Sequence, residues 1–273
     1  MSRTRHREDG RATERETRRE LLRAGIGISM AFSGCLGSGG KSSSTNGHSK
    51  VRRRRYAVTV DGRRERLTLD VPTAAYKRAQ EQPRSLSRAI ASARSSELLH
   101  QLGRQIAAGY ETNSEQLLAA QAAVASIPYA TDTASTGTGE YVRYPVETLT
   151  EQTGDCEDVA VLLAGLLESP ALGFQSGLVV TESHCAALVA TEEIDSSIVA
   201  ADALGLTLSG TDYIYLEATD RSPPGSRGGS NREQPLLAAY LHHWYLLDMP
   251  ALRDALAEAV KTEEVDYAWQ FIR

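Results

Sequence analysis

The fold is decided by residues 154–168, which read GDCEDVAVLLAGLLE. Gly154 permits a tight turn, and Asp155 is a favoured residue type at the position that caps a helix N-terminus. From Cys156 onward, apolar residues recur at positions 156, 160, 163 and 167 and therefore share one helix face. The pattern predicts a helix that begins at Cys156 and turns this cysteine toward the body of the protein.

Two electrostatic influences oppose each other at this cysteine. A helix N-terminus favours negative charge by ~0.3–1 kcal/mol at exposed sites, which helps a thiolate form. The neighbouring acids Asp155, Glu157 and Asp158 disfavour a further negative charge. A nucleophilic Cys156 therefore needs a cationic partner.

Of the six histidines, His184 is the one that opens a predicted strand, residues 184–190. Alternation along this strand puts His184 and Cys185 on opposite faces, so Cys185 is predicted to be a core thiol. His242 and His243 are predicted to lie in a late apolar helix. Adjacent helix residues point about 100° apart, so this pair does not indicate a metal site.

Two more strands are predicted near His184, at residues 177–181 and 213–219. Glu217 lies near the end of the second strand. A carboxylate there can accept the second imidazole N–H of His184, hold the ring and stabilise the imidazolium that forms when the ring takes a thiol proton. Cys156, His184 and Glu217 are thus the candidate catalytic residues.

Residues 144–220 resemble the transglutaminase-like cysteine hydrolase superfamily, in particular its small prokaryotic members with papain-like topology. The likeness rests on YPVETL and GDCEDVAVLLAGLL, followed by SHCAALVA and YIYLEAT. It implies an α+β fold in which the nucleophile helix packs on an antiparallel sheet after a helical lead-in. Cys156 matches the nucleophile and His184 the base. Glu217 stands where many members have Asp, and Asp220 is an alternative acid.

The resemblance implies acyl transfer. Cys156 would attack an amide or ester carbonyl, His184 would protonate the leaving amine, and water or another amine would resolve the thioester. The backbone N–H of Cys156 is a natural oxyanion donor, while Gln152 and Tyr129 are guesses for a second donor. We expect an amide or peptide hydrolase that acts on a protein or peptide substrate, with no cofactor and no metal.

Three alternatives stay open. The chain could be a catalytically silent transglutaminase-like module for binding or assembly at the cell surface. Cys156 and Cys185 could form a structural disulfide, although alternation argues against it, because the strand face that presents His184 hides Cys185. Cys156, His184 and an acid could instead be zinc ligands.

The acids near the cysteine could also surround a hard cation, because such ions prefer clustered oxygens. The residues concerned are Glu147, Asp155, Glu157 and Asp158. We favour the simpler interpretation, in which Asp155 caps the helix, Asp158 or Glu157 is in solvent and Glu147 holds the preceding loop.

Residues 1–35 are typical of an export signal. An arginine pair at 18–19 resembles a twin-arginine signal, a weakly apolar run follows at 24–34, and FSGC ends at a lipobox-like Cys35. The small polar residues of segment 36–50 indicate a flexible tether. We expect an exported protein at the cell surface, held to the membrane by a lipid at Cys35.

Composition excludes some classes of partner and of scaffold. The 273 residues carry a net charge of −5, but residues 1–66 hold 17 of the 30 basic side chains, and residues 67–273 hold 28 of the 35 acidic ones. Such an acidic body repels nucleic acid, so no nucleic-acid partner is expected, and together with the signal it suggests a salt-loving archaeon. Three cysteines cannot make a disulfide-rich scaffold.

The remaining segments predict the domain organisation. Residues 51–83 form a short lead-in whose Asp-Gly turn at 61–62 indicates a hairpin, with an arginine run that suits a solvated edge or anionic lipid headgroups. Residues 84–273 form the transglutaminase-like domain. Its predicted elements are a helix over 86–108, a helix capped by Asn113 or Ser114 and ending at Pro128, a loop over 129–144, and an amphipathic helix within 251–273.

Overall fold

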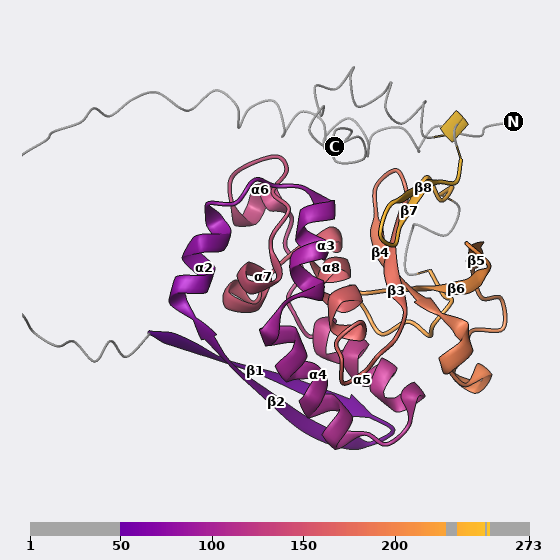
Figure 1. Ribbon diagram of the computed structural model, residues 1–273, viewed down its shortest axis with the longest axis horizontal. Coiled ribbons are helices and arrows are strands. Elements are labelled where there is room, and N and C mark those ends of the chain that lie inside the picture. The colour runs from indigo at the N-terminus through magenta and orange to yellow at the C-terminus, as the bar shows by residue number, and fades with distance from the viewer. Residues whose placement is uncertain (1–49, 228–233, 249, 252–273) are drawn as a thin grey trace, which may run out of the picture. The chain divides into compact units, whose positions relative to one another are not determined.

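The computed structural model describes residues 50–227, 234–248, 250 and 251 (Figure 1). The predicted signal at 1–35, Cys35 and nearly all of the tether lie outside the described residues, as does the predicted helix within 251–273 beyond its first residue. Within the described part of the chain, no helix is both long and apolar enough to cross a membrane.

The lead-in is a hairpin, as predicted. Strand β1 (Val51–Val60) pairs antiparallel with β2 (Arg63–Pro72) in a two-stranded sheet. Asp61 and Gly62 join them with positive φ angles of 48° and 80°, the conformation that suits Asp-Gly in a two-residue turn. The hairpin is not separate from the rest, because its inner face belongs to the main core; the residues concerned are Tyr56, Val58, Val60, Leu67, Leu69 and Val71.

Three helices lie between the hairpin and residue 110, where the sequence predicted one. Helix α2 (Thr73–Gln80) was not predicted, and the segment 86–108 divides into α3 (Leu86–Arg94) and α4 (Glu97–Gly109). The break has a local cause. The Ser96 side chain accepts the N–H of Leu99 and so caps a new helix start.

Helix α5 (Asn113–Val124) begins one residue after its cap, Thr112. The prediction of Asn113 or Ser114 as the cap was therefore wrong by one or two residues. Thr112 and Glu115 form a reciprocal capping box, which satisfies two backbone N–H groups at once. The helix ends before Pro128 is reached.

Three helices build the part of the chain around the candidate cysteine, which is itself the first residue of the third. Helix α6 (Asp132–Ser135) lies in the segment predicted as a loop, and α7 (Pro145–Glu151) precedes α8 (Cys156–Leu167). Helix α8 begins where the sequence predicts, and every residue after Cys156 in it is buried. It is therefore the central helix of the body, packed against helices and strands (Figure 1).

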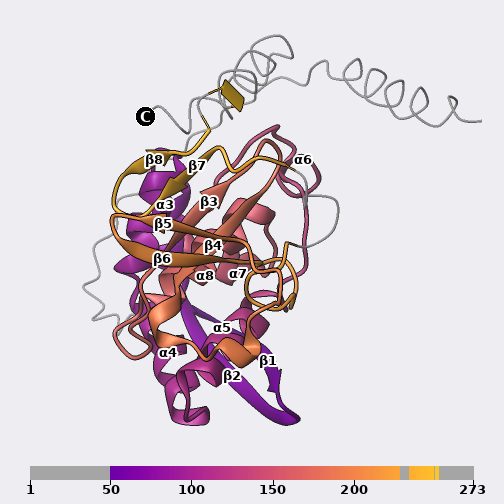
Figure 2. The same cartoon turned by 90° about the vertical axis from the view of Figure 1, so that its right-hand side faces the viewer.

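A six-stranded antiparallel sheet completes the α+β fold, in the order β5-β6-β4-β3-β7-β8 (Figure 2). Its strands are β3 (Ser176–Val180), β4 (Cys185–Ala190), β5 (Gly205–Leu208), β6 (Thr211–Leu216), β7 (Ala238–Tyr240) and β8 (Trp244–Leu246). Short 3₁₀ turns, η2 (Thr191–Glu193) and η3 (Ser196–Ile198), lie between β4 and β5.

The two faces of the sheet differ as alternation predicts. Cys185 and Ala187 of β4 face the main core that contains α8, whereas Ala186, Leu188 and Tyr215 belong to a second apolar cluster on the other face. The central strands are thus covered on both sides.

The prediction of a late apolar helix around His242 and His243 was wrong. These residues form the turn between β7 and β8, and β7 pairs with β3. The short apolar runs on either side extend the sheet instead, with β7 mostly buried and β8 partly exposed. Periodicity alone does not distinguish a strand from a helix over so few residues.

Replacing Gly165 in α8 by alanine tests the close crossing of α8 and α3. An added Cβ would lie 3.0 Å from the carbonyl carbon of Ala93 and closer still to its Cβ. We expect a loss of about 1–3 kcal/mol in the free energy of unfolding, more than the ~1 kcal/mol that alanine usually gains over glycine in a helix. The measurement is urea unfolding. Gly139→Ala is the control, since nothing lies within 4 Å there, and equal stability of the two variants would contradict the packing.

Candidate active site

His184 and Glu217 meet at one end of neighbouring strands. His184 directly precedes β4, and Glu217 directly follows β6, which pairs with β4. The His184 Nε2 atom lies 3.0 Å from Glu217 Oε2 and 3.2 Å from Oε1, and both side chains are buried. Nδ1 is therefore the ring nitrogen left for another partner.

Glu217 is held as a carboxylate by several donors. The Tyr215 hydroxyl donates to Oε2 at 2.8 Å, and Oε1 accepts from the Ala218 N–H at 3.0 Å and from the Thr219 hydroxyl at 2.7 Å. Burial alone raises the pKa of Glu217, but the hydrogen bond and charge of His184, together with Thr219, outweigh it and lower the pKa to about 2. The sequence analysis did not identify these supporting donors.

The other acid, Asp220, lies away from the histidine. Its side chain is exposed and accepts the Ser222 N–H at 2.7 Å. Gln121 of α5 fixes the same segment from inside, because its Nε2 donates to the carbonyls of Glu217 and Ser222 at 3.0 and 2.9 Å. Of the two predicted acids, the structure brings Glu217 to His184.

Cys156 is the first residue of α8 and is partly exposed. Its Sγ donates to Glu157 Oε2 at 3.2 Å. Within the described residues, no hydrogen bond joins Cys156 to His184. The pKa of the Cys156 thiol is raised, first by burial and then by the charges of Glu157, Cys185 and Asp155. In this arrangement the thiol is protonated and turned to an acid.

Cys185, the first residue of β4, is the second thiol near the candidate site. It is buried, and its pKa is raised by burial, then by Glu157 and Asp155 at the start of α8, and then by Glu217. Charges at the start of α8 and on Glu217 therefore both act on this thiol. Both cysteines are free. Alternation was nevertheless the wrong reason to disfavour a disulfide, because Cys185 faces the core cluster against which Cys156 also packs.

Three buried carboxylates gather beside the thiol. One oxygen each of Asp132, Asp155 and Glu157 lies within 4.8 Å of the others. Burial, then Glu157, raises the pKa of Asp155 to about 9, and burial, then Asp158, raises that of Glu157 to about 7. Asp155 Oδ1 is buried with no hydrogen-bond partner. These three residues could hold a hard divalent cation.

Some predictions for the individual acids were confirmed, and others were wrong. Asp155 occupies the N-cap position of α8, as predicted, but its side chain makes no capping hydrogen bond. Glu157 and Asp158 are both buried, so the prediction that one of them is in solvent was wrong. Glu147 holds the loop before α7, as predicted, since it accepts the Tyr144 N–H and pairs with Arg84.

Arg143 is the reason that Asp158 is inside. This arginine is completely buried and donates to Asp158 at 2.7 Å, to Asp132 at 2.9 Å and to Glu151 at 3.0 Å. A buried guanidinium requires such compensation. The sequence analysis missed Arg143 and Asp132, because no local pattern links an arginine to acids in three separate elements.

The two candidates for a second oxyanion donor, Tyr129 and Gln152, lie in different environments. Tyr129 is exposed, yet partial burial and then the charges of Cys156 and Asp155 raise its pKa to about 12. Gln152 ends α7 in a left-handed conformation with φ of 55°. Tyr129 is therefore the one of the two with an electrostatic link to Cys156.

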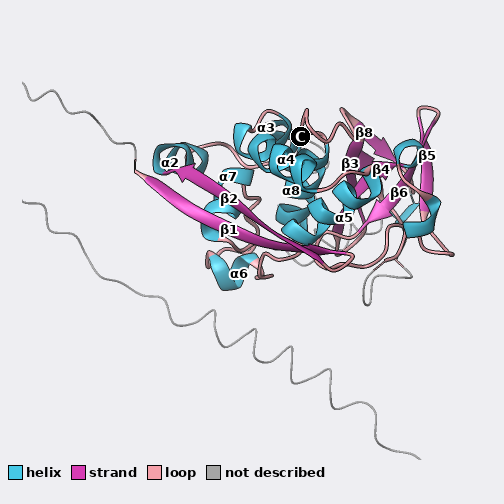
Figure 3. Cartoon of the chain, turned by 90° about the horizontal axis from the view of Figure 1, so that it is seen from below, coloured by secondary structure: helices cyan, strands magenta, loops and turns pink. Residues whose placement is uncertain are grey.

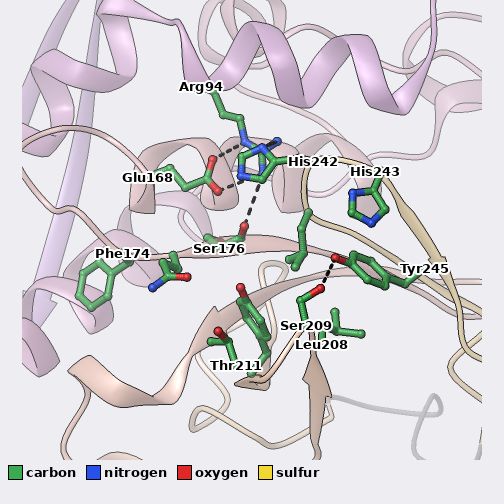
Figure 4. Close-up of a pocket in the computed structure, with 13 residues that line it drawn as sticks. Arg94, Glu168, Phe174, Ser176, Leu208, Ser209, Thr211, His242, His243 and Tyr245 are labelled. Atoms are coloured by element: carbon green, nitrogen blue, oxygen red, sulfur yellow. Dashed lines mark hydrogen bonds and ion pairs between the residues drawn. The ribbon is translucent and has the colours of Figure 1, made fainter.

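A separate pocket of about 520 Å³ lies where the β7–β8 turn approaches α3 (Figure 4). His242 and His243 line it, but Cys156, His184 and Glu217 do not. His242 Nδ1 lies 3.4 Å from Arg94, while the His243 ring stacks at 4.4 Å against Tyr245. The two imidazoles have different partners. The helix geometry on which the prediction against a metal pair rested is absent, because both residues lie in a turn.

Comparisons with known proteins give little more. No protein-family model matches the chain, and no curated protein does. Among solved structures, Legionella pneumophila LapG in a calcium-bound form is similar with a TM-score of 0.34 and 13% identity, over 64% of this chain and 99% of that chain. A likeness of this size carries no argument about function.

The lowered pKa of Glu217 predicts how the stability of the protein changes with pH. A carboxylate whose pKa falls on folding contributes stability above its ordinary pKa, and this stability is lost as the pH falls toward the folded value. Between about pH 5 and pH 2, the wild type should therefore lose on the order of 3 kcal/mol more unfolding free energy than Glu217→Gln. Denaturant unfolding at stepwise pH measures the two slopes, and parallel slopes would show that Glu217 is not held in this way.

Proposed function

We propose that the protein is a thiol-dependent acyl-transfer enzyme of the transglutaminase-like, papain-like class, most simply an amide or peptide hydrolase. The observation that carries the proposal is the buried His184–Glu217 pair, with Nε2 on the carboxylate and Nδ1 left over. Cys156 is the partly exposed thiol at the start of α8, a helix that contacts β4. The proposed substrate is a protein or peptide, and the proposed location is the cell surface, with a lipid at Cys35.

The proposed reaction uses these groups in turn. His184 Nδ1 takes the thiol proton, and the Cys156 sulfur attacks the carbonyl carbon, forming a C–S bond. The amine leaves with the proton that His184 carries. Water then attacks the thioester, loses a proton to His184 and releases the acid, and the sulfur regains its proton. Glu217 stabilises the imidazolium in both halves, and the Cys156 N–H is a donor for the oxyanion.

Before attack, the thiol must exchange its present partner. Cys156 Sγ donates to Glu157 rather than to His184, and three acids stand close by. Catalytic hydrogen bonds are often absent or long without substrate and tighten when substrate binds. Rotation of the Cys156 side chain away from Glu157 is the movement that the proposal requires.

Alkylation by iodoacetamide tests the thiol. In the folded full-length chain at neutral pH, the peptide containing Cys156 should be labelled quickly, whereas buried Cys185 should stay unlabelled until the protein unfolds. His184→Ala should slow labelling of Cys156 by about tenfold or more, because it removes the base. Peptide-level mass spectrometry separates the cysteines.

The matched control is His243→Ala, which removes an exposed imidazole from the β7–β8 turn. Equal labelling rates in both histidine variants would contradict the pairing. Release of amine from a peptide library, lost in Cys156→Ala, distinguishes an enzyme from the second candidate, a silent surface-binding module. Retention of the cellular phenotype by Cys156→Ala would favour that module.

We also propose that Asp132, Asp155 and Glu157 bind a hard divalent cation such as calcium, which prefers clustered carboxylate oxygens. The support lies in this chain: three buried carboxylates converge, and Asp155 Oδ1 lacks a partner. Such an ion would supply positive charge beside the thiol. No step of the proposed reaction passes through it.

Calcium binding is tested by thermal unfolding and by titration calorimetry. Saturating calcium should raise the Tm of the wild type, since a ligand that binds only the folded state stabilises it by about 2.7 kcal/mol at 100 times its Kd. Asp155→Asn should abolish the calcium-dependent shift, whereas Asp61→Asn, in an exposed turn, should keep it. A wild type without heat of binding or shift would exclude the site.

A further inference from the structure

The outward face of the β1–β2 hairpin concentrates positive charge. Strand alternation puts Arg55 of β1 and Arg64 and Arg66 of β2 on this face, opposite the buried residues. In the pairing register, Arg64 lies across from Thr59 and Arg66 across from Ala57. Arg221, from the loop after Glu217, reaches the same edge and lies 3.5 Å from the Thr59 carbonyl. We call these four arginines the arginine face.

Three arginines of this face, Arg55, Arg64 and Arg66, differ from their neighbours because they lack partners. Arg53 pairs with Asp70 at 2.7 Å, and Arg54 donates to the Thr150 carbonyl. By contrast, within residues 50–227 and the other described positions, the side chains of Arg55, Arg64 and Arg66 make no ion pair. All three are exposed. Their charge is therefore available to an anion from outside.

The face is also hollowed. An open depression of about 380 Å³ is lined by Ala57, Thr59, Arg64, Glu65, Arg66 and Arg221. Ala57 and Thr59 contribute small side chains to this lining. Glu65 contributes one carboxylate, which lies 3.5 Å from Arg63. A phosphate-sized group could approach several guanidinium groups there.

The position of the hairpin indicates which anion. Its inner face is covered by helices α4 and α5, so the arginines face outward (Figure 3). Residues 50–72 contain eight basic and three acidic residues, in contrast to the acidic remainder. Strand β1 begins 16 positions after Cys35, a distance that a chain spans with at most roughly 55 Å. A lipid at Cys35 would hold this hairpin close to the bilayer.

We propose that the arginine face binds the anionic headgroups of a membrane and so orients the body on its surface. The inference deepens the proposed surface location and is independent of the proposed chemistry. Lysines and arginines near an anionic bilayer each add roughly fivefold to the partition coefficient, and salt screens the effect.

Vesicle co-sedimentation of the full-length chain, produced without lipid, tests the proposal. The wild type should bind vesicles containing phosphatidylglycerol but not vesicles of phosphatidylcholine alone, and high salt should release it. The triple variant Arg55→Gln, Arg64→Gln, Arg66→Gln should lose binding on the order of a hundredfold. The matched control removes three exposed charges from α2 and α3, as Lys77→Gln, Arg78→Gln, Arg88→Gln, and should lose much less.

Several outcomes would overturn the proposal: equal binding of the two triple variants, no preference for anionic vesicles, or binding of duplex DNA but not of vesicles. Unchanged circular dichroism and Tm show that the variants fold. The labelling rate of Cys156 should be the same in the arginine variant and the wild type. Loss of vesicle binding with intact labelling separates the membrane surface from the thiol chemistry.

Discussion

The buried guanidinium of Arg143 is the interaction on which the candidate site depends. It joins Asp132 in α6, Glu151 at the end of α7 and Asp158 in the first turn of α8. A buried charge without partners costs several kcal/mol, so these three elements are held together as a unit. The unit fixes the start of α8 and with it the position of Cys156. Gly154 belongs to the same arrangement, since a Cβ there would lie 2.8 Å from that of Asp158.

The second half of the site is built on the sheet. Antiparallel pairing of β4 and β6 brings the residue before one strand and the residue after the other to the same end, which is where His184 and Glu217 meet. Tyr215, Ala218 and Thr219 satisfy the carboxylate, so that it stays charged despite burial. A charged and immobile carboxylate is what an imidazole needs in order to be held in one orientation.

The charges around Cys156 oppose the thiolate that the proposed reaction needs. The start of α8 collects carboxylates next to the thiol, and their charge opposes a thiolate. The proposed transfer of the thiol proton to His184 works against this opposition. Proton sharing or a bound cation at Asp132, Asp155 and Glu157 would reduce this opposition. On the surface of the hairpin the repelling charges are positive instead. Its unpaired arginines repel one another, and an external anion would reduce that repulsion.

Local pattern in the sequence was sufficient for much of the fold. It determined the hairpin at Asp61-Gly62, the helix that begins at Cys156, and the alternation of Cys185 and Ala186, because each depends on neighbours within a few residues. It also identified Glu217 as a partner for His184. It failed where short apolar runs are ambiguous, as around His242, and where Ser96 interrupts a helical pattern.

Tertiary structure decided the remainder. The sequence by itself determined which residue types are available for thiol chemistry and on which elements they lie. Only the folded chain decided that Arg143 buries Asp158, that Asp132 joins the acids beside Cys156, and that Asp220 stays in solvent. The physical reason is distance along the chain: these charges compensate one another across separate elements, and no local propensity encodes a pairing that forms only when the elements pack.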